Sequence, residues 1–143
     1  MKVVINRCFG GFCLSDKAVE MIMKRKGLDC FRYARTKYEF SDGIDEFERR
    51  EDNPGDKMFP LIYYSVKNLG EKVSELPDDV VWDNDNISRD DADLIAVVEE
   101  LGREASSRVS NLVVVEIPDN VSWVIQEYDG IESIHEAHRI WIK

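Results

Sequence analysis

The sequence has little of what several classes of protein require. It has three cysteines and no Cys-x-x-Cys pair, so neither a disulfide scaffold nor a clustered zinc site is expected. No apolar run approaches the roughly 18–20 residues that a membrane helix needs. The first residues lack the pattern of a secretory signal peptide. We therefore expect a cytoplasmic protein with reduced thiols, without a metal, a cofactor or a membrane segment.

The sequence has fewer basic than acidic residues. The 143 residues include 19 Lys or Arg and 29 Asp or Glu, which gives a net charge of −10 and argues against binding to duplex nucleic acid. The charge is uneven, because residues 17–37 hold seven basic and two acidic residues, a local balance of 7 − 2 = +5. This distribution favours a compact anionic ligand over a long polyanion. The alternative is a solvated helix face.

The order of the expected elements indicates one α/β domain spanning residues 1–143. A hydrophobic fraction of 43% is ample for a core. The pattern predicts a single mixed-sheet domain with two main helices and an added β-hairpin. The expected strands are 3–5, 61–64, 80–82, 112–115 and 123–128, and the hairpin joins 38–40 to 44–47. The expected helices run from Ser15 or Asp16 to about Gly27, from Ser88 to about Ala105, and over the shorter stretches 69–76 and 131–138.

The loop between the first strand and the first helix is the leading candidate site. Backbone N–H groups beside glycines and the positive end of a helix favour phosphate, and aromatic side chains can stack on a base. The candidates are Asn6, Arg7, Phe9, Gly10, Gly11 and Phe12. The loop matches neither Gly-x-Gly-x-x-Gly nor the Walker sequence, which argues against a nucleoside-triphosphate hydrolase. A tight turn packed by two aromatic rings is the simpler interpretation.

Two further segments carry candidate ligand contacts. Arg103, Ser106 and Arg108 follow the second long helix, where guanidinium and hydroxyl groups can hold phosphate or ribose oxygens. Arginines that complement the helix dipole are the alternative. Near the carboxyl end, His138 and Arg139 follow His135, and the two histidines can act as ligand contacts or as acid–base groups. No ordered Ser, His and acid arrangement supports a hydrolase, and contact with a partner subunit or with the ligand is the alternative to catalysis.

Four stretches of the chain resemble a known family. They are KVVINRCFGGF at 2–12, VVEELG at 97–102, VVEIPD at 114–119 and EYDGIESIHEAHR at 127–139. With these strings the chain resembles the first-described family of Thoeris anti-defence proteins of phages and prophages. Residues 31–88 carry no such resemblance.

The resemblance implies a protein that sequesters a signal and has no enzymatic activity. Such proteins bind the cyclic ADP-ribose-type signal made by a TIR-domain sensor, some are thought to bind cyclic oligonucleotides of the related CBASS defence, and they form homo-oligomers. The family pattern carries Ala-Asn-Gly where this chain has Ala105-Ser106-Ser107. The resemblance therefore implies a hydroxyl at Ser106 in place of an amide contact.

Two other functions fit the residues. One is a phosphodiesterase-like enzyme on a small nucleotide, with His135 or His138 as the acid or base. The other is an inhibitor that binds a protein through its acidic surface.

Overall fold

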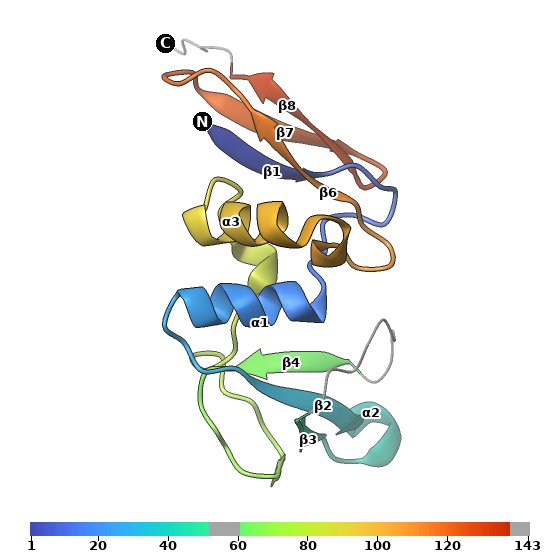
Figure 1. Ribbon diagram of the computed structural model, residues 1–143. Helices are drawn as coiled ribbons and strands as arrows, with labels where there is room; N and C mark the ends of the chain where they lie inside the picture. The colour runs from blue at the N-terminus through green and yellow to red at the C-terminus, as the bar shows by residue number, and fades with distance from the viewer. Residues whose placement is uncertain (52–60, 138–143) are drawn as a thin grey trace, which may run out of the picture. The chain divides into compact units, whose positions relative to one another are not determined.

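The computed structural model describes residues 1–51 and 61–137 (Figure 1). The chain divides into two compact units. The terminal unit comprises Met1–Ala18 and Ile87–Lys143, and the central unit comprises Val19–Asn86. Each unit is described by itself, and one domain spanning 1–143 stays a prediction.

The core of the terminal unit lies between a two-stranded ribbon and a helix. Strand β1 (Lys2–Asn6) pairs antiparallel with β6 (Leu112–Glu116), with Val4 opposite Val114. Helix α3 (Ala92–Leu101) contacts both strands and contributes fully or nearly fully buried apolar side chains to this core. A continuous run of β-branched residues makes β1 a buried strand, as predicted.

Helix α3 begins later than predicted. Its cap is Asp91, whose carboxylate accepts hydrogen bonds from the backbone N–H groups of Asp93 at 2.9 Å and Leu94 at 3.0 Å. Ser88 instead bonds the side chain of Asp90. The helix ends at Leu101 and continues as the 3₁₀ turn η2 (Gly102–Ala105). The expected start at Ser88 was therefore three residues before the residue that caps the helix.

The prediction of a helix over 131–138 was wrong. Strands β7 (Trp123–Tyr128) and β8 (Ile131–Glu136) form an antiparallel hairpin. Asp129 and Gly130 join them with φ values of 55° and 89°. Positive φ at both central residues is the geometry of a type I′ turn, whose twist matches that of paired strands. The Asp-Gly pair therefore starts a hairpin rather than a helix.

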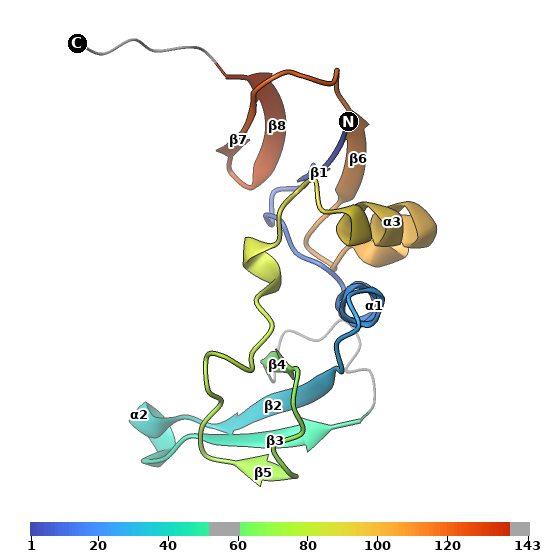
Figure 2. The ribbon, with the colours of Figure 1, turned by 90° about the vertical axis from the view of Figure 1, so that its left-hand side faces the viewer.

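The central unit is a four-stranded antiparallel sheet in the order β4-β2-β3-β5 (Figure 2). The strands are β2 (Phe31–Lys37), β3 (Glu46–Arg50), β4 (Ile62–Ser65) and β5 (Lys72–Val73). Helix α1 (Asp16–Arg25) begins in the terminal unit, where Ser15 Oγ accepts from Ala18 N. Its later residues lie over the sheet, with Val19, Ile22 and Met23 buried.

Three expectations for this unit needed correction. Strand β2 was not predicted, and it reaches β3 through the helical turn α2 (Glu39–Asp42). The first hairpin strand therefore lies before the expected 38–40, and the second overlaps the expected 44–47 only at residues 46 and 47. No helix covers 69–76, because Tyr33 Oη accepts from Leu69 N and donates to Gly70 O, both at 2.8 Å. The expected strand 80–82 makes one bridge, Val81 to Ser65, before the 3₁₀ turn η1 (Asn84–Asn86).

The α/β class is confirmed, with α1 and α3 as the two main helices and a hairpin added. Every strand pair within the described residues is antiparallel. No helix within 1–51 and 61–137 is long and apolar enough to cross a membrane.

Candidate functional site

Three segments of the terminal unit meet at one end of β1. We call residues 6–13, 106–111 and 129–132 the loop cluster. Arg7 N donates to Asn111 O at 2.8 Å, and Ser110 Oγ donates to Cys13 O at 2.6 Å. The cluster therefore brings together the predicted loop, the end of the second long helix and part of the carboxyl-terminal segment.

Asn6 holds all three segments together. Its side-chain amide donates to Cys8 O at 2.7 Å and Gly130 O at 2.8 Å, while its Oδ1 accepts from Asn111 N at 2.8 Å. The residue is fully buried. A buried amide with these partners fixes the loop. Its position does not offer the side chain to a ligand.

Close backbone contacts explain two glycines of the cluster. A Cβ built on Gly10 would lie 1.9 Å from Val109 O, and one built on Gly130 would lie 2.1 Å from Phe9 O. Both distances are far below van der Waals contact, so only glycine allows the segments to lie this close.

A buried ion pair lies under the loop and was missed by sequence reasoning. Glu132 accepts from Asn6 N at 2.7 Å and from both terminal nitrogens of Arg89, at 2.6 and 2.8 Å. The Arg89 guanidinium also lies 3.6 Å from the centre of the Phe12 ring. The signal was available: a hairpin beginning at Asp129-Gly130 makes Glu132 a strand residue in a family-like string. A carboxylate that is buried on a strand needs a cationic partner, because burying an unpaired charge is costly.

Two of the predicted contacts at the helix end also have structural partners. Ser106, 7% exposed, accepts from Leu112 N at 2.8 Å through its hydroxyl. Arg103 Nη1 donates to Ser110 O at 2.5 Å, although the side chain is exposed. These contacts shape the turn before β6, as capping and turn residues commonly do.

The exposed side of the cluster presents cations and an aromatic ring. Phe9 is 71% exposed, and Arg7 and Arg108 are exposed. The Arg7 side chain donates from Nη1 to Glu132 O at 2.6 Å. Arg108 makes no hydrogen bond or ion pair within the part of the chain that the structure describes. Because Gly10 packs on Val109, the segment with Phe9 and the segment with Arg108 are neighbours.

Of the two predicted histidines only His135 lies within the described residues, and it is on a strand rather than on the helix expected over 131–138. His135 lies on β8 opposite Val124, is exposed, and bonds Ser133 Oγ through Nε2 at 2.8 Å. His138 and Arg139 lie outside the described residues.

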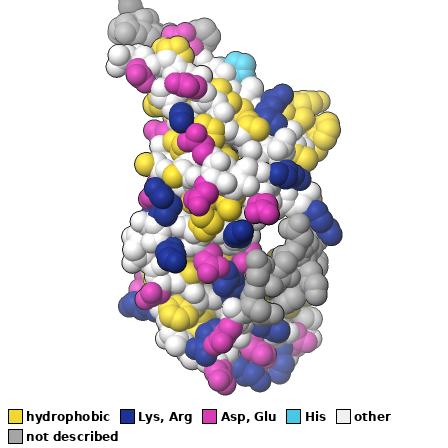
Figure 3. All heavy atoms as spheres, viewed as in Figure 1, with side chains coloured by type: hydrophobic (Ala, Val, Ile, Leu, Met, Phe, Trp, Pro, Cys, Tyr) yellow, Lys and Arg dark blue, Asp and Glu magenta, His cyan; other side chains and the backbone are white. Residues whose placement is uncertain are grey.

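The basic stretch 17–37 is not one patch. It runs through α1 and β2, and three of its cations are paired with carboxylates: Lys17 with Glu104, Arg32 with Glu20, and Arg35 with Asp45. On the face viewed in Figure 3, basic and acidic side chains are interspersed. The local charge excess therefore does not by itself mark a site for an anion.

Within the described residues no three His, Cys, Asp or Glu side chains are placed to hold a metal ion. The three cysteines are free thiols, each partly buried. A comparison of the chain with protein-family models, with curated proteins and with solved structures finds no match.

Proposed function

We propose that this protein is a phage anti-defence protein that binds a small cyclic nucleotide of the cyclic ADP-ribose type and sequesters it without cleaving it. It acts in the cytoplasm of the infected host as a homo-oligomer. The observation that carries the proposal is the exposed Phe9 and Arg108 on neighbouring segments of a loop cluster whose backbone is held in place. The resemblance of residues 2–12 and 127–139 to the Thoeris anti-defence family supports it, although the segment with Arg108 lies outside the stretches that carry the resemblance.

The chemistry of the exposed groups suits such a ligand. A guanidinium group binds phosphate oxygens through charge-assisted, often bidentate hydrogen bonds. An exposed aromatic ring stacks on a base, and stacking is worth about 1–3 kcal/mol per base. Arg7 and Arg108 supply the first contact and Phe9 the second.

The buried residues of the cluster supply rigidity. Asn6, Gly10 and the Glu132–Arg89 pair hold the loop before any ligand arrives. A loop that is ordered in advance loses less conformational entropy on binding, which raises affinity. A protein that must compete with a receptor needs a dissociation constant of about nanomolar order, near −12 kcal/mol. A second copy of the chain would complete the site by removing more of the ligand from water.

Recovery of the ligand separates sequestration from catalysis. The purified protein is mixed with cyclic ADP-ribose, small molecules are removed by filtration, and the retained fraction is heated to unfold the protein. Chromatography of the released material should recover intact nucleotide. A cleaved product would indicate the phosphodiesterase-like alternative, and an empty retained fraction would contradict the proposal.

Matched substitutions locate the binding site. Arg108→Ala should weaken binding about tenfold or more, because one charge-assisted contact is worth about 1.5–3 kcal/mol. Phe9→Ala should weaken it by a similar factor through lost stacking. Arg50→Ala and Phe40→Ala remove an exposed arginine and a 90% exposed phenylalanine of the central unit, and both should bind normally. Equal binding by all four variants would place the ligand elsewhere.

A further inference from the structure

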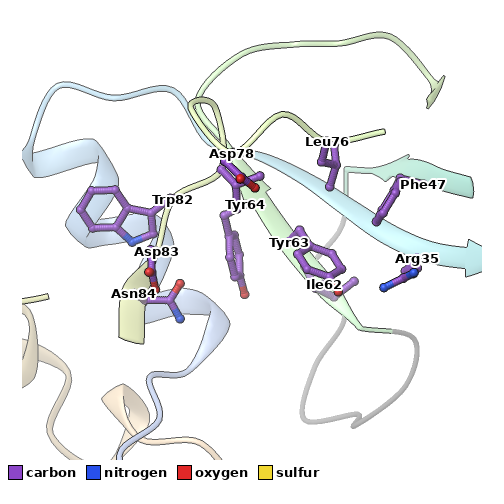
Figure 4. Close-up of a pocket in the computed structure, with 11 residues that line it drawn as sticks. Arg35, Phe47, Ile62, Tyr63, Tyr64, Leu76, Asp78, Trp82, Asp83 and Asn84 are labelled. Carbon is purple, nitrogen blue, oxygen red and sulfur yellow. The ribbon is translucent and has the colours of Figure 1, made fainter. Parts of the chain in front are cut away.

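The central unit contains a pocket of about 560 Å³ that the proposed function does not use (Figure 4). This volume is typical of sites for small organic ligands. Strands β2, β3 and β4 and residues 76–84 supply its walls. The lining includes four aromatic side chains: Phe47, Tyr63, Tyr64 and Trp82.

A fixed guanidinium lies at one end of the pocket. Arg35 Nη2 donates to Asp45 Oδ1 at 2.6 Å, and its guanidinium lies 4.4 Å from the centre of the Tyr38 ring and 5.5 Å from that of Phe47. In Figure 4, Arg35 and Trp82 mark opposite ends of the lining, with Tyr63 and Tyr64 between them. The pocket is therefore a row of aromatic side chains with an N–H group at each end.

Both of these N–H groups are unsatisfied. Arg35 Nε and Trp82 Nε1 are buried and have no hydrogen-bond acceptor within residues 1–51 and 61–137. Buried hydrogen-bond donors are nearly always paired, so two unpaired donors on residues that line one cavity need an explanation. The ring and the guanidinium already line the cavity, and a short turn of each toward it would meet an acceptor on a bound molecule. A ligand with acceptor atoms supplies what both groups lack.

The charge of the lining selects against anions. Asp45 balances the charge of Arg35, and Asp78 and Asp83 add two carboxylates to the wall. A phosphate here would face repulsion from Asp78. Hydroxyl groups, in contrast, donate well to a carboxylate.

We infer that this pocket binds an uncharged purine nucleoside, with the base among the aromatic side chains, an acceptor atom of the base on Trp82 Nε1, and the ribose oxygens toward Arg35 Nε and Asp78. A planar heterocycle suits the aromatic walls, since stacked and edge-on contacts between rings are favourable. This site is independent of the loop cluster, and its ligand differs from the proposed one by having no phosphate.

The indole N–H of Trp82 reports on binding directly. The chain has three tryptophans, so its ¹H–¹⁵N spectrum holds three indole signals, and the signal missing in Trp82→Phe identifies Trp82. Titration with adenosine or guanosine should shift that signal downfield to saturation, as expected when its N–H gains an acceptor. Adenosine monophosphate should bind more weakly than adenosine because its phosphate would be repelled by Asp78.

Two variants provide the controls. Trp82→Phe keeps an aromatic ring but removes the donor, and should weaken nucleoside binding about tenfold. Trp123→Phe makes the same change on β7 and should leave binding unaltered. Arg108→Ala should also leave it unaltered, so the result is separable from the test of the loop cluster. The inference is overturned by a Trp82 signal that stays fixed at millimolar nucleoside, by normal binding in Trp82→Phe, or by tighter binding of the monophosphate.

Discussion

Glu132 on β8 binds Arg89 through both carboxylate oxygens, with Oε1 2.6 Å from Nη1 and Oε2 2.8 Å from Nη2. Glu132 is 7% exposed and Arg89 is 17% exposed at the side chain. Oε1 also accepts from Asn6 N at 2.7 Å. One carboxylate therefore links three segments that lie far apart in the sequence, and the shape of the loop cluster depends on it.

Replacing Glu132 by Gln should destabilise the terminal unit. The amide keeps the shape but removes the charge and turns an N–H₂ group toward Arg89, which leaves a mostly buried cation without its partner. Breaking one side of a buried pair costs about 3 kcal/mol or more. Urea unfolding should show this loss of free energy, whereas Glu136→Gln, an exposed change on the same strand, should stay within about 0.5 kcal/mol of the wild type. Equal stability of the two variants would contradict the structural role of the pair.

Adding one methyl group at Gly130 should cost more than adding it at Gly11. Both residues have positive φ, 89° and 86°, so alanine brings similar backbone strain of about 1 kcal/mol at each. Only at Gly130 would the new Cβ overlap the backbone, at Phe9 O. The difference between Gly130→Ala and Gly11→Ala in urea unfolding should be about 2 kcal/mol, since overpacking costs about 1–3 kcal/mol. A difference near zero would show that the cluster relaxes around the methyl group.

The sequence predicts those elements whose identity depends on local pattern. The β-branched residues of β1 and β6 and the apolar stripes of α1 and α3 each specify one structure by their own spacing. The elements that were predicted wrongly depend on contacts with residues distant in the sequence. Residues 69–76 have helical spacing, but Tyr33 bonds Leu69 and Gly70 and prevents the helix.

The candidate site shows the same limit. The loop of residues 6–12 was a candidate from the sequence because glycines beside a strand end are a local signal, but the sequence did not indicate that the other segments meet there. The sequence does not predict that Asn6 is buried and Phe9 is exposed. Both follow from contacts with Gly130 and Asn111, which lie more than 100 residues away in the sequence. The pocket beside Arg35 and Trp82 had no local signal, because four separate stretches of the chain line it.

The start of α3 differs between the prediction from the sequence, at Ser88, and the structure, where Asp91 caps the helix. Asp91→Ala removes the acceptor for two backbone N–H groups and should cost about 1 kcal/mol. Ser88→Ala removes only a hydroxyl that bonds a neighbouring carboxylate and should change stability by less than about 0.5 kcal/mol. Both values come from urea unfolding. The opposite order would assign the cap to Ser88 and shift the start of the helix.

The last prediction concerns acid. Arg35 lowers the pKa of Asp45 below its usual value of 3.8 through the side-chain hydrogen bond, and the backbone N–H of Glu39 lowers it further. A depressed folded-state pKa means that ionised Asp45 stabilises the central unit above the unfolded pKa. That contribution disappears as the pH falls from 3.8 through the folded pKa.

Asp45→Asn removes this contribution at every pH. The wild type should therefore exceed the variant in stability near neutral pH, and the gap should narrow as the pH falls below 3.8 and through the lowered pKa of folded Asp45. Urea midpoints measured across that range give the gap directly. Asp29→Asn, a change at an exposed carboxylate of the same unit, serves as the control and should show a smaller gap at neutral pH. A gap for Asp45→Asn that stayed constant with pH would mean that the pair with Arg35 does not form in solution, and it would also remove the anchor that holds the guanidinium at the end of the central pocket.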